Sequence, residues 1–215
     1  MFWIASAITL VFLALLLVAE WFDSQRLRWA VKPVASTAFI AAAWAAGALD
    51  SAYGVAVIVG LALSWWGDVL LIPKGQTRVF QAGVIAFLLG HVAYSIGFVV
   101  RGVDPVWFAG AAVALVAVAA VVLRWLWPNV GSAMKGAVIA YVVVISTMVA
   151  LAIGTVAAHG DFTILVGAVI FYLSDLSVAR ERFVKQGFIN RIWGLPFYYV
   201  AQLVLAWTVM AASGG

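Results

Sequence analysis

The stretch GLALSWWGDVLLI (Gly60–Ile72) decides the fold, because it is typical of a membrane-spanning helix and yet contains a carboxylate, Asp68. A charged side chain inside a bilayer is costly and usually faces the protein interior or a wet cavity. A second stretch, GAVIFYLSD (Gly167–Asp175), repeats the spacing from glycine to aspartate. The repetition indicates either two parallel four-helix halves or a coincidence in apolar sequence. We therefore expect Asp68 and Asp175 to mark a functional site.

The composition predicts an integral membrane protein. Of the 215 residues, 67% are hydrophobic and only 9% are charged, whereas a soluble chain has roughly a quarter charged residues. We expect residues 1–215 to form a single transmembrane domain. The absence of cysteine excludes disulfides, thiolate metal sites and cysteine nucleophiles. The net charge of +4 comes from short loops between apolar segments, so we expect a lipid bilayer and no nucleic acid as partner.

The apolar segments predict an all-α bundle of eight transmembrane helices, because each segment approaches the roughly 20 residues that a span requires. The connections are short, and the longest is predicted at Arg180–Ile192. The expected helices are Trp3–Trp21, Ala30–Ala46, Tyr53–Ile72, Val79–Val100, Pro105–Trp127, Gly136–Ala158, Phe162–Ala179 and Trp193–Ala212.

The basic residues predict the orientation. All of them except Arg101 lie in or beside the first, third, fifth and seventh connections. The positive-inside rule places these connections in the cytoplasm and both termini outside, as in a multi-pass protein of a bacterial inner membrane. The first segment has no basic residue before Arg26, so we expect a retained helix rather than a cleaved signal peptide.

Polar side chains gather in the predicted cytoplasmic half. Asp68 and Asp175 each lie about 6 Å from the inner end of their helix at 1.5 Å per residue. Glu20 and Lys32 lie at the same side, and we expect them to form a buried ion pair between the first two helices. Together these residues predict a cavity that opens toward the inner leaflet.

The fourth predicted helix has a stripe in which small and aromatic residues alternate, and small residues let helices approach closely in lipid. His91 borders this stripe, about 10 Å deeper than the aspartates. It is either a packing histidine or a member of the site. The members of the stripe are Gly83, Phe87, Gly90, Tyr94 and Gly97.

Two interpretations of the aspartates remain open. In the structural one, each is hydrogen-bonded to a neighbouring helix or paired with Lys32 or a loop arginine. In the functional one, two nearby carboxyls share one proton and supply one acid and one base. A metal site built from His91, Asp68 and Asp175 is a third possibility, but the chain has only two histidines, and we expect neither metal nor cofactor.

Several short motifs, in this order and spacing, resemble the YhhN-like, or lysoplasmalogenase, family. The resemblance implies an eight-helix membrane hydrolase that cleaves the vinyl ether bond of lysoplasmalogens to a fatty aldehyde and a glycerophospho-alcohol. The family's paired aspartates match Asp68 and Asp175. The motifs are Lys32-Pro33, Ser64-x-x-Gly67-Asp68-x-x-Leu71, Phe80-x-x-Gly83-x-x-x-Phe87-x-x-Gly90-His91-x-x-Tyr94, Gly167-Ala168-x-x-Phe171-x-x-Ser174-Asp175 and Tyr199-x-Ala201-Gln202.

Vinyl ether hydrolysis requires an acid that protonates carbon, a carboxylate that stabilises the oxocarbenium ion, and a base for water. We expect Asp68, Asp175 and His91 to be catalytic, with Asp175 as the acid and Asp68 as the stabiliser, or the reverse. A lysophospholipid would place its tail between the helices and its phosphate head near the basic cluster at 180–191. The expected substrate-binding residues are Lys32, Ser64, Tyr94, Ser174, Tyr198, Tyr199 and Gln202.

Two other functions also use aspartates within the membrane. One is an intramembrane aspartyl protease, but Trp65 occupies the position of the first glycine of a Gly-x-Gly-Asp motif. The other is a small proton-coupled transporter or a lipid-binding protein without enzymatic activity, for which carboxylates near the midplane are typical. No predicted span is visibly broken, which argues against a transporter.

Overall fold

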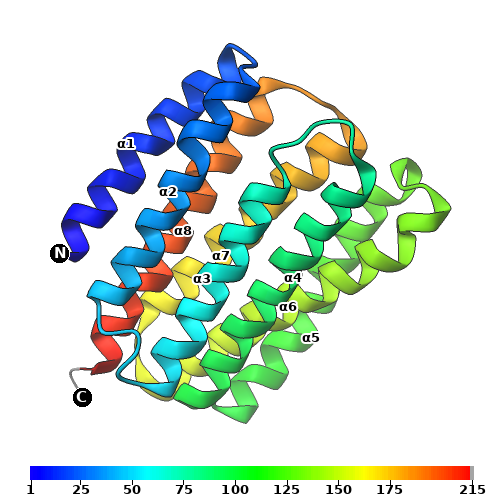
Figure 1. The fold of residues 1–215 in the computed structure, drawn as a ribbon. Helices are drawn as coiled ribbons and strands as arrows, with labels where there is room; N and C mark the ends of the chain where they lie inside the picture. Colours follow the sequence, from blue (N-terminus) through cyan, green and yellow to red (C-terminus); the bar gives the residue numbers. More distant parts are fainter. Residues whose placement is uncertain (214–215) are drawn as a thin grey trace.

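The computed structural model describes residues 1–213, and within them the chain forms eight α-helices and no strand (Figure 1). This confirms the all-α fold class. A short 3-10 helix, η1 (Trp127–Asn129), follows α5, and a π-helix, η2 (Arg180–Val184), follows α7. The α-helices are α1 (Phe2–Trp21), α2 (Gln25–Ala45), α3 (Ala52–Leu70), α4 (Thr77–Arg101), α5 (Pro105–Leu126), α6 (Ser132–His159), α7 (Phe162–Ala179) and α8 (Phe188–Ser213).

The helices make the chain an integral, multi-pass membrane protein. Seven of the helices in residues 1–213 are long and apolar enough to cross a bilayer. The exception is α2, which contains Arg26, Arg28 and Lys32. The eighth span therefore stays a prediction.

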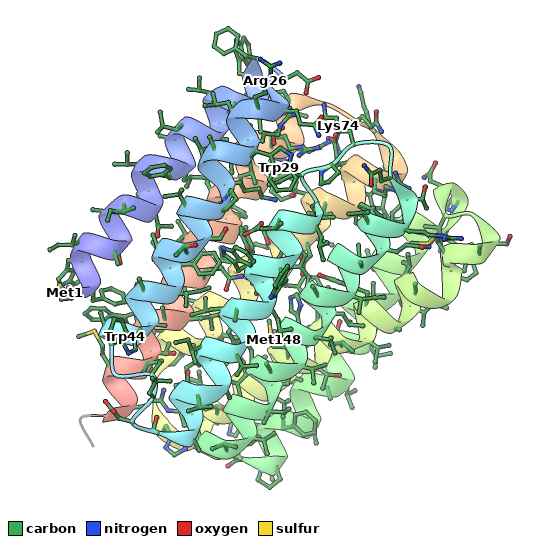
Figure 2. All side chains as sticks on the ribbon, in the orientation of Figure 1. Met1, Arg26, Trp29, Trp44, Lys74 and Met148 are labelled. Carbon is green, nitrogen blue, oxygen red and sulfur yellow. The ribbon has the colours of Figure 1, made fainter. Side chains whose placement is uncertain are left out.

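The helices run up and down, so the connections after α1, α3, α5 and α7 lie at one end of the bundle (Figure 1). The helix α1 begins, and α8 ends, at the opposite end. Figure 2 shows Arg26 and Lys74 at the first end and Met1 at the other. Basic residues other than Arg101 are thus separated from the termini as the sequence indicates, while the N-out/C-out orientation stays a prediction.

Three helix starts and one loop were predicted wrongly, and the smallest of these errors is at α6, which starts at Ser132 rather than Gly136. The helix α2 starts five residues before Ala30, because Ser24 Oγ caps it by accepting a hydrogen bond from Leu27 N at 3.3 Å. The helix α8 starts at Phe188 rather than Trp193, and η2 continues α7, so the expected Arg180–Ile192 loop shrinks to residues 185–187. Hydropathy marks only the apolar part of a helix and misses polar ends whose charges have partners in the fold.

The close packing of α3 on α4 confirms the role of the glycine and aromatic stripe. A Cβ atom placed on Gly67 would lie 2.5 Å from the Phe87 ring, and one on Gly60 would lie 2.7 Å from the Tyr94 ring. Only glycine allows these rings to approach the α3 backbone so closely. The same contact brings the His91 turn of α4 next to the aspartate-bearing part of α3.

The helix α5 lies at the edge of the bundle and packs mainly on α6 (Figure 1). Its only buried residues are Ala111, Val122 and Leu126, and its other face exposes valine and alanine side chains. A stable apolar helix with so little buried surface fits a protein surrounded by acyl chains.

Candidate active site

A cavity of about 460 Å³ opens among the helices and has two chemically different parts. Small-molecule sites typically span roughly 300–1,000 Å³. The polar part carries both aspartates, Glu20 from α1, Arg28 from α2, and residues from the connections after α3 and α7. The apolar part is formed by α4, α5 and α6, through Phe80, Val84, Phe87, Val122, Leu126, Val138, Val142 and Ile145. The sequence correctly predicted a polar cavity in the half of the bundle with the basic loops.

Asp68 is 2% exposed and surrounded by hydrogen-bond donors. Its Oδ1 lies 3.0 Å from Lys32 Nζ. Its Oδ2 accepts hydrogen bonds from Ser36 Oγ at 2.5 Å and from Tyr198 OH at 2.7 Å. Both oxygens thus act as acceptors, which matches an ionised carboxylate. Asp68 therefore provides a fixed negative charge at the cavity wall.

Helix geometry explains how these donors meet. Lys32 and Ser36 lie one turn apart on α2, so they share the face that packs on α3. Lys32 also donates to the backbone oxygen of Asp68 at 3.1 Å, and Tyr198 reaches in from α8. Ser36 was not among the expected site residues, although its spacing from Lys32 could have identified it.

The expected ion pair between Glu20 and Lys32 does not form. Glu20 instead pairs with Arg28 at 2.9 Å and with Arg191 at 3.6 Å. Arg28 lies one turn before Lys32 on α2, near the end of α1, whereas Lys32 lies opposite Asp68 on α3. Two acids and several basic residues were predicted at similar depth, and only the rotation of each helix about its axis decided which of them meet.

Asp175 pairs with His91 across the interface of α7 and α4. Asp175 Oδ2 lies 3.0 Å from His91 Nε2. His91 is fully buried, and its ring stacks on Phe171 with a centroid distance of 4.2 Å. Phe171 is one turn before Asp175, so α7 supplies both the charge and the ring that hold the imidazole. His91 therefore contacts Asp175 directly, while its place in a functional site stays a prediction.

The contacts of His91 require a proton between the imidazole and Asp175. His91 Nδ1 lies 2.7 Å from the backbone oxygen of Phe87, and a carbonyl only accepts, so Nδ1 carries a hydrogen. In a neutral ring Nε2 is then an acceptor, facing an acceptor oxygen of Asp175. Neither atom has another hydrogen-bond partner among residues 1–213. Their 3.0 Å approach is attractive only when the pair shares a proton.

Tyr141 is a site residue that the sequence analysis missed. It lies on α6, lines the cavity and interacts with the Asp175 carboxylate through its side chain. Its ring also meets that of His91 edge-on at 5.6 Å. A tyrosine in the middle of an otherwise apolar span was the available signal, but nothing in the sequence indicates which partner it meets.

Both aspartates line the same cavity, but no hydrogen bond joins the two carboxyl groups in the described chain. Each has its own partner instead: Lys32 for Asp68 and His91 for Asp175. Residues 1–213 contain no group of three or more histidine or acidic side chains placed to hold a metal ion.

The other expected substrate-binding residues divide into two groups. Ser174 and Tyr198 line the cavity, as does Lys32. The remaining four lie behind the cavity wall in hydrogen-bonded pairs: Tyr94 OH donates to Gln202 Oε1 at 2.6 Å, Gln202 Nε2 to Ser64 Oγ at 3.4 Å, and Tyr199 OH lies 3.1 Å from Ser36 Oγ. They support the wall, and Tyr199 supports Asp68 through Ser36.

The sequence of the chain is similar to a known protein family and to a curated relative. A sequence model of the YhhN family matches residues 27–209. The chain is similar to "Lysoplasmalogenase TMEM86A" of Bos taurus, with 29% identity over 156 residues, which are 70% of this chain and 63% of the relative. The chain thus covers less than two thirds of that relative's length. No solved structure matches the chain.

Proposed function

Because the chain belongs to the YhhN family, we propose that it is a membrane hydrolase that cleaves the vinyl ether bond of lysoplasmalogen-type lysophospholipids. The products would be a fatty aldehyde and a glycerophospho-alcohol. The similarity to a lysoplasmalogenase supports the substrate class. The observation that carries the mechanism is the difference between the two carboxylates of the cavity, one surrounded by donors and one paired with an imidazole.

Asp175 with His91 is the proposed acid. Hydrolysis begins when a proton adds to the vinyl carbon that is not bonded to oxygen, which converts the ether into an oxocarbenium ion. The proton between His91 Nε2 and Asp175 Oδ2 is the available one, since Asp175 lines the cavity. The buried imidazole can then take up a replacement proton and return it to the carboxyl. A positioned acid of this kind contributes about 10²- to 10⁴-fold to the rate.

Asp68 is the proposed stabiliser of the cation. Its charge is fixed by Lys32, Ser36 and Tyr198 before substrate arrives, and a preorganised charge needs no rearrangement during the reaction. Water then adds to the oxocarbenium carbon while the carboxylate accepts the proton that water loses. The resulting hemiacetal collapses to aldehyde and alcohol. In the collapse Asp68 returns its proton to the ether oxygen, the C–O bond breaks, and the hydroxyl proton of the hemiacetal returns to the pair of Asp175 and His91. One water is consumed for each ether bond that is cleaved.

The two parts of the cavity fit a lipid with a single tail. The apolar part between α4, α5 and α6 would hold the chain, and the polar part would hold the glycerol and its phosphate. The basic connections at the same end of the bundle would face the cytoplasm of a bacterial inner membrane, with both termini outside. In this proposal residues 1–215 form a single domain of eight membrane spans.

The test is aldehyde release from a vinyl ether lysophospholipid by purified protein in detergent. We expect turnover by the wild type, and a loss of about 10²-fold or more in kcat for Asp175→Asn and for Asp68→Asn. Asp50→Asn is the matched control, because Asp50 lies outside the cavity lining. Turnover that survives both cavity substitutions would remove the catalytic assignment. A wild type that, reconstituted in vesicles, transports the lipid without forming aldehyde would replace the proposed function.

A further inference from the structure

The cations that line the cavity are almost all paired with carboxylates. Lys32 contacts Asp68, Lys74 contacts Asp23, and the arginines Arg28 and Arg191 share Glu20. Arg182 is the exception within residues 1–213: it lines the cavity, has no carboxylate partner and lies over the Phe80 ring at 4.4 Å. The ring holds the guanidinium plane while leaving its edge free to donate hydrogen bonds.

Arg28 supplies a second unsatisfied donor at the same end of the cavity. The residue is 4% exposed and lines the cavity, yet its Nη1 has no hydrogen-bond partner in the described chain. A buried polar group without a partner destabilises the protein, so a ligand that accepts a hydrogen bond from it binds more tightly by removing that penalty. An ion-pair series links Arg28 through Glu20 and Arg191 to Glu181, the neighbour of Arg182.

The charges of the side chains that line the cavity limit the charge of the ligand that it can bind. Five basic side chains line the cavity, and four of them have a carboxylate partner. Among residues 1–213, Arg182 is the cavity cation without one, so its positive charge is left unpaired. A phosphate diester carries a single negative charge, whereas a phosphate monoester carries about −1.5 to −2. Arginine forks match phosphate oxygens geometrically. The unpaired charge therefore fits a diester better than a monoester.

We infer that Arg182 and Arg28 form a subsite for the phosphate diester of a lysophospholipid head group. This inference rests on the proposed function for the identity of the lipid, but not for the chemistry of the subsite. Bound there, the phosphate would hold the glycerol between the arginines and the aspartates while the tail occupies the apolar part. Arg182 would be a specificity-determining residue that contacts substrate without taking part in bond cleavage.

The test measures binding with lipids that cannot be hydrolysed. One probe is a 1-O-alkyl lysophosphoethanolamine, whose saturated ether resists protonation, and the other is the 1-O-alkyl glycerol of equal chain length. We expect Arg182→Gln to weaken binding of the first probe by about 10-fold or more and to change binding of the second by less than about 2-fold. Lys185→Gln is the matched control, because Lys185 is exposed near Arg182 and lies outside the cavity lining.

Two further measurements separate the arginine fork from its charge, and a lipid head group from free phosphate. Arg28→Lys retains the charge but not the fork, and it should also weaken only the phosphate probe; if this variant does not fold, the Arg182 result alone decides. Inorganic phosphate should compete poorly, because it lacks the tail. Equal loss for both lipid probes, no loss for the phosphate probe, or equally tight Arg182-dependent binding of inorganic phosphate would each overturn the inferred lipid subsite.

Failure of the subsite is distinguishable from failure of the proposed function. A wild type that releases aldehyde while Arg182→Gln retains the wild-type KM would overturn the subsite alone. A wild type that binds the phosphate probe through Arg182 but releases no aldehyde would support the subsite and remove the hydrolase assignment.

Discussion

Breaking the contact between Lys32 and Asp68 should destabilise the fold strongly, whereas replacing both residues should not. The two side chains are 11% and 2% exposed, and their charged atoms lie 3.0 Å apart. At an effective dielectric of about 20, this attraction is about 5–6 kcal/mol before desolvation is subtracted. Removal of one partner leaves a buried charge, for which losses of about 3–5 kcal/mol are typical. We therefore expect Lys32→Met and Asp68→Leu each to lower the free energy of unfolding by about that amount.

The double variant Lys32→Met/Asp68→Leu removes both charges together and should recover most of the loss. A coupling of about 3 kcal/mol corresponds to a factor of about 150 in the unfolding equilibrium. The assay is reversible unfolding of the protein in mixed micelles, followed by far-UV circular dichroism. The matched cycle at the exposed contact of Lys74 with Asp23 should show a much smaller coupling, because solvent screens exposed charges. Additive losses at Lys32 and Asp68 would refute the reasoning, since they would mean that neither charge depends on the other.

Three further predictions concern packing, catalysis and pH. Gly67→Ala should lower the free energy of unfolding by about 1–3 kcal/mol, because the added Cβ would lie 2.5 Å from the Phe87 ring, whereas Gly136→Ala, in open space, should be neutral or slightly stabilising in the same assay. Tyr141→Phe should lower kcat by about 10-fold in the aldehyde assay with little change in KM, because it removes a hydroxyl that acts on Asp175; an unchanged kcat would contradict that role. Hydrogen bonds from Lys74 and Arg28 lower the pKa of the exposed Asp23 to about 2. The contribution of Asp23 to stability should therefore be complete above about pH 4 and disappear toward pH 2. Unfolding of wild type and of Asp23→Asn should be compared across this range, and a difference in stability that grows on acidification would contradict the prediction.

Much of the fold followed from the sequence because hydrophobic length is a local property. Each apolar segment is long enough for a helix, and α7 was predicted with its observed ends, Phe162–Ala179. The starts of α2 and α8 were predicted too late, since Arg28 and Asn190 are polar residues buried in helices. Their partners, Glu20 for Arg28 and Glu181 for Asn190, come from other parts of the chain.

The sequence by itself determined that two aspartates lie at matching depth inside a helical membrane protein, because helical rise and hydropathy fix depth along a span. It could not determine the partner of either one. The rotation of each helix about its axis decides whether a side chain meets Lys32, His91 or lipid, and that rotation depends on packing against all neighbours at once. Only the tertiary structure therefore separated Asp68, which is surrounded by donors, from Asp175, which pairs with His91. The same packing buried Tyr94 and Gln202 behind the wall and brought Ser36 and Tyr141 to the two carboxylates.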